Sequence, residues 1–103
     1  MDELGKRLKQ LRLERDLTQD MMAYDMNQLF GTEITKANLS RWENGLNEPS
    51  LHYARYLCKY FNVSLDYLIG NTDVRTPTNL LINSRKGPAS KEVSKKKNDT
   101  LEN

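Results

Sequence analysis

Apolar residues recur at intervals of three or four positions along the first part of this chain, which is the spacing of one helix face. Five segments show it: Leu4, Leu8 and Leu11; Met22, Met26 and either Leu29 or Phe30; either Ala37 or Asn38, with Leu39 and Trp42; Leu51, Ala54, Leu57, Cys58 and Phe61; and Leu65, Leu68 and Ile69. Residues 1–70 show no alternation typical of a half-buried strand. The pattern predicts an all-α fold of five short helices.

Residues that favour helix ends stand at the edges of these segments. Side chains that can accept a backbone N–H at a helix start precede four of them: Thr18, Thr35, Ser50 and Ser64. Residues that suit a helix end follow: Gly31, Asn44-Gly45 and Gly70. The first helix should cover residues 2–15 and end at Asp16, in a left-handed conformation that glycine adopts more easily.

The composition changes after Gly70. Residues 71–103 are rich in Asn, Ser, Thr and Lys, lack aromatic residues and hold two of the three prolines, which is typical of a flexible, disordered tail. Their one apolar cluster, Leu80-Leu81-Ile82, could be a loose segment or a short element that docks on the domain or on a partner. We expect one domain over residues 1–70 and a polar, basic C-terminal tail over residues 71–103.

One short segment, TKANLSRWENG at residues 35–45, combines a capping residue, a polar face, an apolar seam and a stop. A second cap, Thr18-Gln19, stands one helix upstream. A helix-turn-helix needs this arrangement to lay its second helix in the major groove of double-stranded DNA. Positions 36, 37 and 41 share roughly one helix face, with 40 and 44 beside it. The segment therefore predicts a DNA-reading helix.

The residue types on that face suit the edges of DNA bases. The guanidinium of Arg41 can pair with guanine, and Asn38 can pair with adenine if its side chain points outward. Lys36 can reach guanine or a phosphate, and Ala37 can pack on a thymine methyl group. Backbone N–H groups at the helix starts favour a phosphate there. The bland alternative for each residue is a solvated surface position, and for Asn38 a position turned toward the core.

Charge is distributed unevenly along the chain. Residues 1–70 hold 9 Lys/Arg and 10 Asp/Glu, a net charge of −1, and residues 71–103 hold 7 and 4, a net of +3. A DNA-binding domain must therefore gather its cations on one face. The sequence has no apolar run of membrane-spanning length, no signal-peptide core and a single cysteine. We expect a cytoplasmic protein without a membrane partner.

Three segments, GKRLKQLRLERDLTQ, LSRWENG and PSLHYARYLCKYFNVSLDYLIG, resemble the Cro/CI-type (lambda-repressor-like, xenobiotic-response-element-like) helix-turn-helix regulators over residues 2–70. The resemblance implies a compact five-helix domain and a transcription factor. It implies base-reading roles for Lys36, Ala37, Asn38 and Arg41. It implies phosphate contacts for Thr18, Gln19, Thr35, Ser40 and Asn44.

The remaining residues of the reading helix have structural roles in this interpretation. Leu39 and Trp42 suit the buried seam. The resemblance implies that Glu43 pairs with Arg12, which would tie the first helix to the third. The stretch between Gln19 and Trp42 is longer than the family pattern, so we expect a longer second helix and an enlarged turn around residues 27–33.

Tyrosines recur on the fourth helix and after it, at Tyr53, Tyr56, Tyr60 and Tyr67. They are either partly buried packing or a dimer or partner surface, where tyrosine is enriched. His52 stands alone, without a cluster at metal-ligand spacing, so we expect no metal and no cofactor.

Three classes of function remain to be compared. The first is a sequence-specific DNA-binding regulator, in our interpretation a repressor that acts as a homodimer on a pseudo-palindromic operator. The second is an antitoxin or another regulator whose main partner is a protein, bound through the tail or the tyrosines. The third is an enzyme, which we do not expect, because the sequence has no nucleophile with an adjacent base and no phosphate loop.

Overall fold

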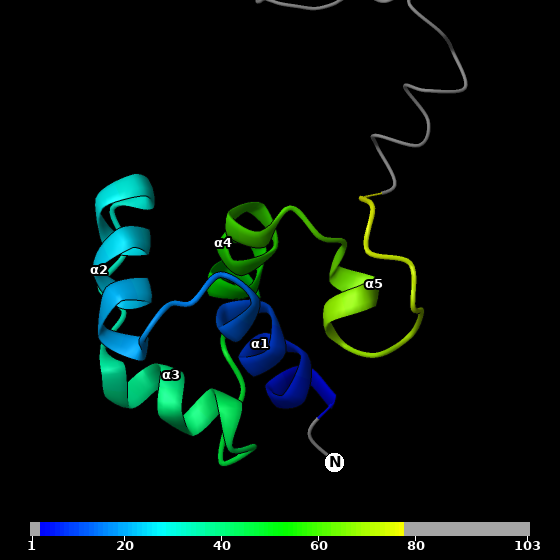
Figure 1. The fold of residues 1–103 in the computed structure, drawn as a ribbon, viewed down its shortest axis with the longest axis horizontal. Coiled ribbons are helices and arrows are strands. Elements are labelled where there is room, and N and C mark those ends of the chain that lie inside the picture. Colours follow the sequence, from blue (N-terminus) through cyan, green and yellow to red (C-terminus); the bar gives the residue numbers. More distant parts are fainter. Residues whose placement is uncertain (1–2, 78–103) are drawn as a thin grey trace, which may run out of the picture.

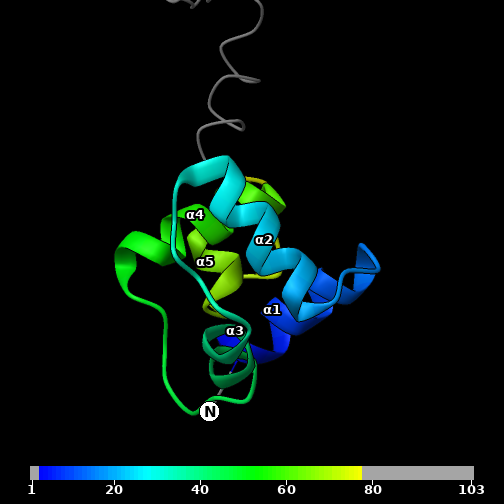
Figure 2. The ribbon, with the colours of Figure 1, turned by 90° about the vertical axis from the view of Figure 1, so that its left-hand side faces the viewer.

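Five helices form the part of the protein that a computed structural model describes, residues 3–77. They are α1 (Glu3–Glu14), α2 (Gln19–Phe30), α3 (Lys36–Glu43), α4 (Leu51–Phe61) and α5 (Leu65–Leu68). Figure 1 shows α1 and α4 in the middle, with α2 and α3 on one side and α5 on the other. Figure 2 shows α2 running across the view above α3, whose axis points toward the viewer. The predicted all-α, five-helix fold is confirmed.

Local side chains begin and end the helices as the sequence predicts. The hydroxyl oxygens of the four predicted caps each accept a backbone N–H three residues on, at 3.0 Å for Thr18, 3.1 Å for Thr35, 3.2 Å for Ser50 and 2.9 Å for Ser64. Asp16 follows α1 in the left-handed region, with φ 57°, and Gly31 ends α2 with φ 68°. These predictions held because capping depends on neighbouring residues alone.

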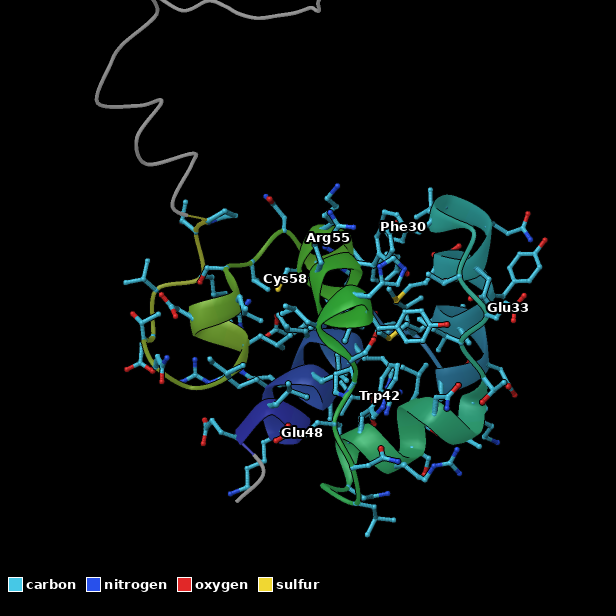
Figure 3. The ribbon with its side chains drawn as sticks, turned by 180° about the vertical axis from the view of Figure 1, so that it is seen from behind. Phe30, Glu33, Trp42, Glu48, Arg55 and Cys58 are labelled. Atoms are coloured by element: carbon cyan, nitrogen blue, oxygen red, sulfur yellow. The ribbon has the colours of Figure 1, made fainter. Side chains whose placement is uncertain are left out.

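The core lies where the five helices meet. Its completely buried side chains are Leu8, Met22, Met26, Leu39, Leu57 and Leu68. Of the two residues that could complete the apolar stripe of α2, Leu29 and Phe30, it is Phe30 that faces inward. It points toward α4 (Figure 3) and stacks on Tyr56 with ring centroids 4.8 Å apart, whereas Leu29 is exposed. On α3, Asn38 is half-buried and Ala37 exposed, so Asn38 lies nearer the apolar side.

Three apolar positions of the helical pattern are not buried. Leu51, placed in the buried stripe of the fourth helix, is 75% exposed, and Leu65 and Ile69, from the fifth apolar segment, are 39% and 42% exposed. Helical spacing identifies a shared face, but it does not show how far the neighbouring helices cover that face. Here Leu51 and Leu65 are the first residues of α4 and α5.

Gly5 lets α1 approach the end of α3 closely. A Cβ atom at this position would lie 2.6 Å from the carbonyl oxygen of Trp42 and 2.7 Å from that of Glu43. These are backbone atoms, which cannot rotate away as a flexible side chain can. The helical pattern did not predict this requirement. Helix propensity says only that glycine is locally unfavourable inside a helix, not which distant backbone atoms lie beside it.

Replacing Gly5 by alanine should lower the free energy of unfolding by about 1–3 kcal/mol, the usual cost of overpacking. The loss should occur although alanine is the better helix former by up to about 1 kcal/mol. Urea denaturation of Gly5→Ala and of the exposed α1 control Lys6→Ala would measure it. A Gly5→Ala protein as stable as the wild type would contradict this close contact between α1 and α3.

Contacts of the helical domain extend past Gly70. The backbone N–H of Ser64 donates to the carbonyl of Arg75 at 2.8 Å. The Arg75 guanidinium donates to both carboxylate oxygens of Glu14, at 2.9 and 2.8 Å, and to the hydroxyl of Tyr67 at 3.1 Å. The hydrogen bonds from Arg75 lower the pKa of Glu14. Residues 71–77 therefore pack on α1 and α5, and Leu80-Leu81-Ile82 lies outside the described residues.

Candidate DNA interface

The third helix lies at the edge of the molecule and is fixed there by its inner face. Leu39 is completely buried, and Trp42 is 5% exposed, with its ring 6.0 Å from that of Tyr53 on α4. Figure 3 shows Trp42 pointing from α3 into the interior. The opposite face of α3 is left to solvent, as a reading helix requires.

A buried ion pair joins α1 to the end of α3. Arg12 Nε donates to Glu43 Oε2 at 2.7 Å, and Arg12 Nη2 donates to Glu43 Oε1 at 2.9 Å. The two side chains are 10% and 3% exposed. Arg12 Nη1 also donates to the carbonyl of Leu17, at 2.7 Å, in the connection between α1 and α2. The predicted Arg12–Glu43 pair is therefore present, in the bidentate form that is strongest for arginine and a carboxylate.

The ion pair has consequences for charge and for position. The hydrogen bonds to Glu43 raise the pKa of Arg12, so the guanidinium keeps its positive charge beside this carboxylate. Gln19, the first residue of α2, donates from Nε2 to Glu43 Oε1 at 3.1 Å. Glu43 thus contacts a side chain from α1 and one from α2. The position of α3 relative to both helices depends on this one carboxylate.

The outward face of α3 carries the residues proposed to read bases. Lys36, Ala37 and Arg41 are exposed. Within residues 3–77, neither Lys36 nor Arg41 forms a salt bridge with a carboxylate. Their charges are therefore available to a nucleic acid. Ser40 is half-buried and Asn44 exposed, and their side chains approach each other, with Asn44 Nδ2 3.4 Å from Ser40 Oγ.

Asn38 also caps the start of α3. Its Oδ1 accepts the backbone N–H of Thr35 at 2.9 Å and lies 3.0 Å from the Thr35 hydroxyl. The Thr35 hydroxyl in turn accepts the backbone N–H of Asn38 at 3.1 Å, which completes a capping box. Pairing with adenine uses both the amide oxygen and the amide nitrogen of asparagine. In this conformation the Asn38 oxygen is occupied, and its nitrogen has no hydrogen-bond partner among the described residues.

Asn27 organises the connection between α2 and α3. Its Nδ2 donates to the carbonyl of Ile34 at 2.9 Å, and its Oδ1 accepts the Ile34 N–H at 2.8 Å and the Thr32 hydroxyl at 2.7 Å. Ile34 and Thr32 are buried. The sequence placed extra residues here but did not identify Asn27, because one asparagine near a helix end is compatible with many roles. The connection is thus a defined structure held by side-chain hydrogen bonds.

Replacing Asn27 by alanine should lower the free energy of unfolding by at least about 2 kcal/mol. Two buried backbone groups of Ile34 would lose their partners, and each such loss costs about 1–3 kcal/mol. Asn27→Asp keeps the acceptor and loses the donor, so its loss should be intermediate. Urea denaturation with the exposed neighbour Gln28→Ala as a control measures this. Equal stability of Asn27→Ala and the control would contradict the assigned role.

The tyrosines are engaged mainly within the domain. Tyr53 packs beside Trp42 and Tyr56 on Phe30, and the Tyr60 hydroxyl donates to Asp25 at 2.7 Å. Burial and this hydrogen bond raise the pKa of Tyr60 to about 12. Tyr67 is 6% exposed and sits under the guanidinium of Arg7, 4.2 Å from the ring centroid. Tyr67 therefore offers no surface to a partner, and the other three present only their half-exposed edges.

The order of the five helices and the exposed outer face of α3 are those of a helix-turn-helix domain. Residues 8–68 match the helix-turn-helix family model, and the chain belongs to that family, in its Cro/CI-type form. The resemblance found in the sequence is thereby confirmed.

Three curated proteins illustrate the relationship. The chain is 30% identical over 74 residues to the HTH-type transcriptional activator BcrR of Enterococcus faecalis. The matched stretch covers 72% of this chain and 33% of BcrR. It is 36% identical over 80 residues to the HTH-type transcriptional regulator ImmR of Bacillus subtilis, covering 76% and 58%. It is 34% identical over 74 residues to the antitoxin PezA of Streptococcus pneumoniae, covering 72% and 43%.

The match to these relatives is limited to part of their length. The chain spans between one third and three fifths of each of them. The family match itself runs over residues 8–68, from α1 to the end of α5. Within residues 3–77, no helix has the length and apolar character needed to cross a membrane.

Proposed function

We propose that this protein represses transcription by binding a pseudo-palindromic operator in double-stranded DNA as a homodimer. The observation that carries the proposal is the two-sided construction of α3. Its inner face is buried and fixed by the Arg12–Glu43 pair, and its outer face presents Lys36 and Arg41, which form no salt bridge within residues 3–77. Two such helices about 34 Å apart would enter successive major grooves on one side of the duplex.

Individual roles follow from residue chemistry. The residues assigned to bases are Lys36, Ala37, Asn38 and Arg41, and those assigned to phosphates are Thr18, Gln19, Thr35, Ser40 and Asn44. Arg41 has the planar fork that suits guanine O6 and N7. Asn38 would read adenine only after its amide oxygen leaves the capping box with Thr35. Gln19 can donate its second amide hydrogen to a phosphate while Glu43 accepts the first.

Binding to genomic fragments at two salt concentrations tests the proposal. Fragments selected by the purified protein are titrated by fluorescence anisotropy, and the complexes are weighed by analytical ultracentrifugation. The logarithm of the affinity should fall with the logarithm of the salt concentration, with a slope of about −0.9 for each phosphate neutralised. Two chains should occupy each selected fragment. A slope near zero, or one chain per fragment, would contradict the proposal.

The direction of regulation needs a separate measurement, because BcrR is named an activator. We propose repression because a domain of this size on an operator can block the promoter without contacting the polymerase. A reporter gene placed behind a selected fragment should lose expression when the protein is produced. Increased expression would instead assign activation while leaving the DNA-binding proposal intact.

A second candidate function is that of an antitoxin, which the similarity to PezA favours. In this case the main partner is a toxin protein, and the tail or the exposed part of the tyrosines on α4 would contact it. Purification of the protein from its native cells distinguishes the two candidates. A stoichiometric protein partner that stays bound in the absence of DNA supports the antitoxin function.

A further inference from the structure

An exposed apolar groove runs along the side of the domain that α3 does not occupy. It has a volume of about 450 Å³, and its lining residues are Leu51, His52, Arg55, Cys58 and Leu65. Leu51 and Leu65, at its two sides, are the exposed leucines that the helical pattern placed in the core. Arg55 and Cys58 lie on α4 (Figure 3), and the end of the described chain lies on the same side of α4 as Cys58. The groove is thus a gap in the apolar packing of α4 and α5.

The course of the chain brings its own tail to this groove. The hydrogen bond between the Ser64 N–H and the Arg75 carbonyl holds residue 75 beside the start of α5, next to the groove residue Leu65. The described chain ends two residues later, at Pro77. Leu80 is three residues further, and three residues span at most about 11 Å. The apolar cluster Leu80-Leu81-Ile82 begins within reach of the groove.

We propose that Leu80-Leu81-Ile82 of the same chain docks into the groove between α4 and α5 and covers Leu51 and Leu65. The six residues 78–83 carry no charge, so burying their side chains removes no ion from water. A short tether gives the segment a local concentration on the order of millimolar, which favours its own groove over that of a second molecule. The proposal concerns the tail alone and does not depend on DNA binding.

Cys58 provides a direct test, because it lines the groove and is the single cysteine of the sequence. A Leu81→Cys variant of the full chain is oxidised mildly and compared with Ser90→Cys, which places the second thiol further along the tail. The disulfide between Cys58 and the introduced thiol of the same molecule should form at least about tenfold faster for Leu81→Cys. The free tail after Pro77 lengthens from 4 residues in Leu81→Cys to 13 in Ser90→Cys, which by itself accounts for roughly sixfold, because each doubling of a loop costs about 0.6 kcal/mol.

The products and rates decide between occupants. A disulfide within single chains, identified by mass spectrometry, supports the proposal. A rate ratio no larger than the roughly sixfold effect of the tether length would overturn it. In the Leu81→Cys variant, a disulfide that joins Cys58 of one chain to the introduced thiol of another would assign the groove to a second copy and would also overturn it.

A second measurement follows the labelling of Cys58 itself and adds no thiol to the tail. The triple variant Leu80→Ser, Leu81→Ser, Ile82→Ser should expose Cys58 to iodoacetamide, with labelling roughly tenfold faster or more than in the wild type. This factor follows because the minor state of a two-state equilibrium is commonly populated at about 10% or less. Burial raises the pKa of the Cys58 thiol. Because the thiolate is the reactive form, the labelling rate depends on pH, and both proteins are labelled at the same pH. An unchanged labelling rate in a variant with an unchanged helical spectrum would contradict the docking.

Discussion

Arg12→Ala is expected to lower the free energy of unfolding by about 3–5 kcal/mol, because it leaves the buried carboxylate of Glu43 without its charged partner. Glu43 is 3% exposed on its side chain and would keep only the Gln19 hydrogen bond at 3.1 Å. A domain of this size has a total stability of roughly 4–11 kcal/mol. The variant should therefore be close to unfolding at 37 °C.

Urea denaturation followed by circular dichroism measures this loss. Lys9→Ala is the matched control, since it removes one cation from an exposed position of the same helix and should change stability by no more than about 0.5 kcal/mol. Arg12→Lys keeps the charge but cannot form the bidentate hydrogen bonds, so its stability should lie between those of Arg12→Ala and Lys9→Ala. An Arg12→Ala protein that melts like Lys9→Ala would show that the pair does not hold α3.

A double variant distinguishes the contribution of the two charges from that of the volume of the two side chains. Arg12→Met combined with Glu43→Leu removes both charges and keeps apolar volume, so it should recover most of the lost stability. It should not recover DNA binding fully, because Gln19 loses the carboxylate that positions it. This contrast assigns part of the role of Glu43 to the placement of α2 and α3.

Arg41→Ala should weaken binding to the preferred DNA site by about 1–3 kcal/mol, the value of one bidentate contact with guanine. This corresponds to a loss of affinity of about 5- to 150-fold. Arg41 is exposed and unpaired within the described residues, so the fold should be unaffected. Affinity for unrelated DNA should fall much less, since it depends on phosphate contacts.

The control for Arg41 is Lys59→Ala, which removes the same charge from the exposed face of α4. It should reduce affinity slightly and equally for all fragments. Lys36→Ala distinguishes two roles for Lys36. A uniform loss with a smaller salt slope assigns Lys36 to a phosphate, and a loss confined to the preferred site assigns it to a base.

The helix limits could be predicted from the sequence because their causes are local. Thr18, Thr35 and Ser64 cap their own helices, and Gly31 adopts its left-handed conformation without help from distant residues. The predicted Arg12–Glu43 pair came from resemblance to a family, since nothing in a spacing of 31 positions brings two side chains together.

Features that depend on contacts between distant segments could not be predicted. The need for glycine at position 5 arises from the backbone at the end of α3. The three hydrogen bonds of Asn27 exist only because α2 and the following turn fold back on each other. The exposure of Leu51 depends on which helices reach the start of α4. The assignment of individual residues to bases and phosphates, and the boundary at residue 70, stay predictions.

We propose that α3 reads base pairs through its outer face, with Arg41 as the main contact. Selection of bound DNA from a random library, followed by sequencing, tests it most directly when done in parallel for the wild type and Arg41→Ala. The wild type should select two related half-sites about 10 base pairs apart. Arg41→Ala should lose the preference for one G·C pair in each half-site and keep the others. Identical motifs for the two proteins, or no motif for the wild type, would contradict the claim.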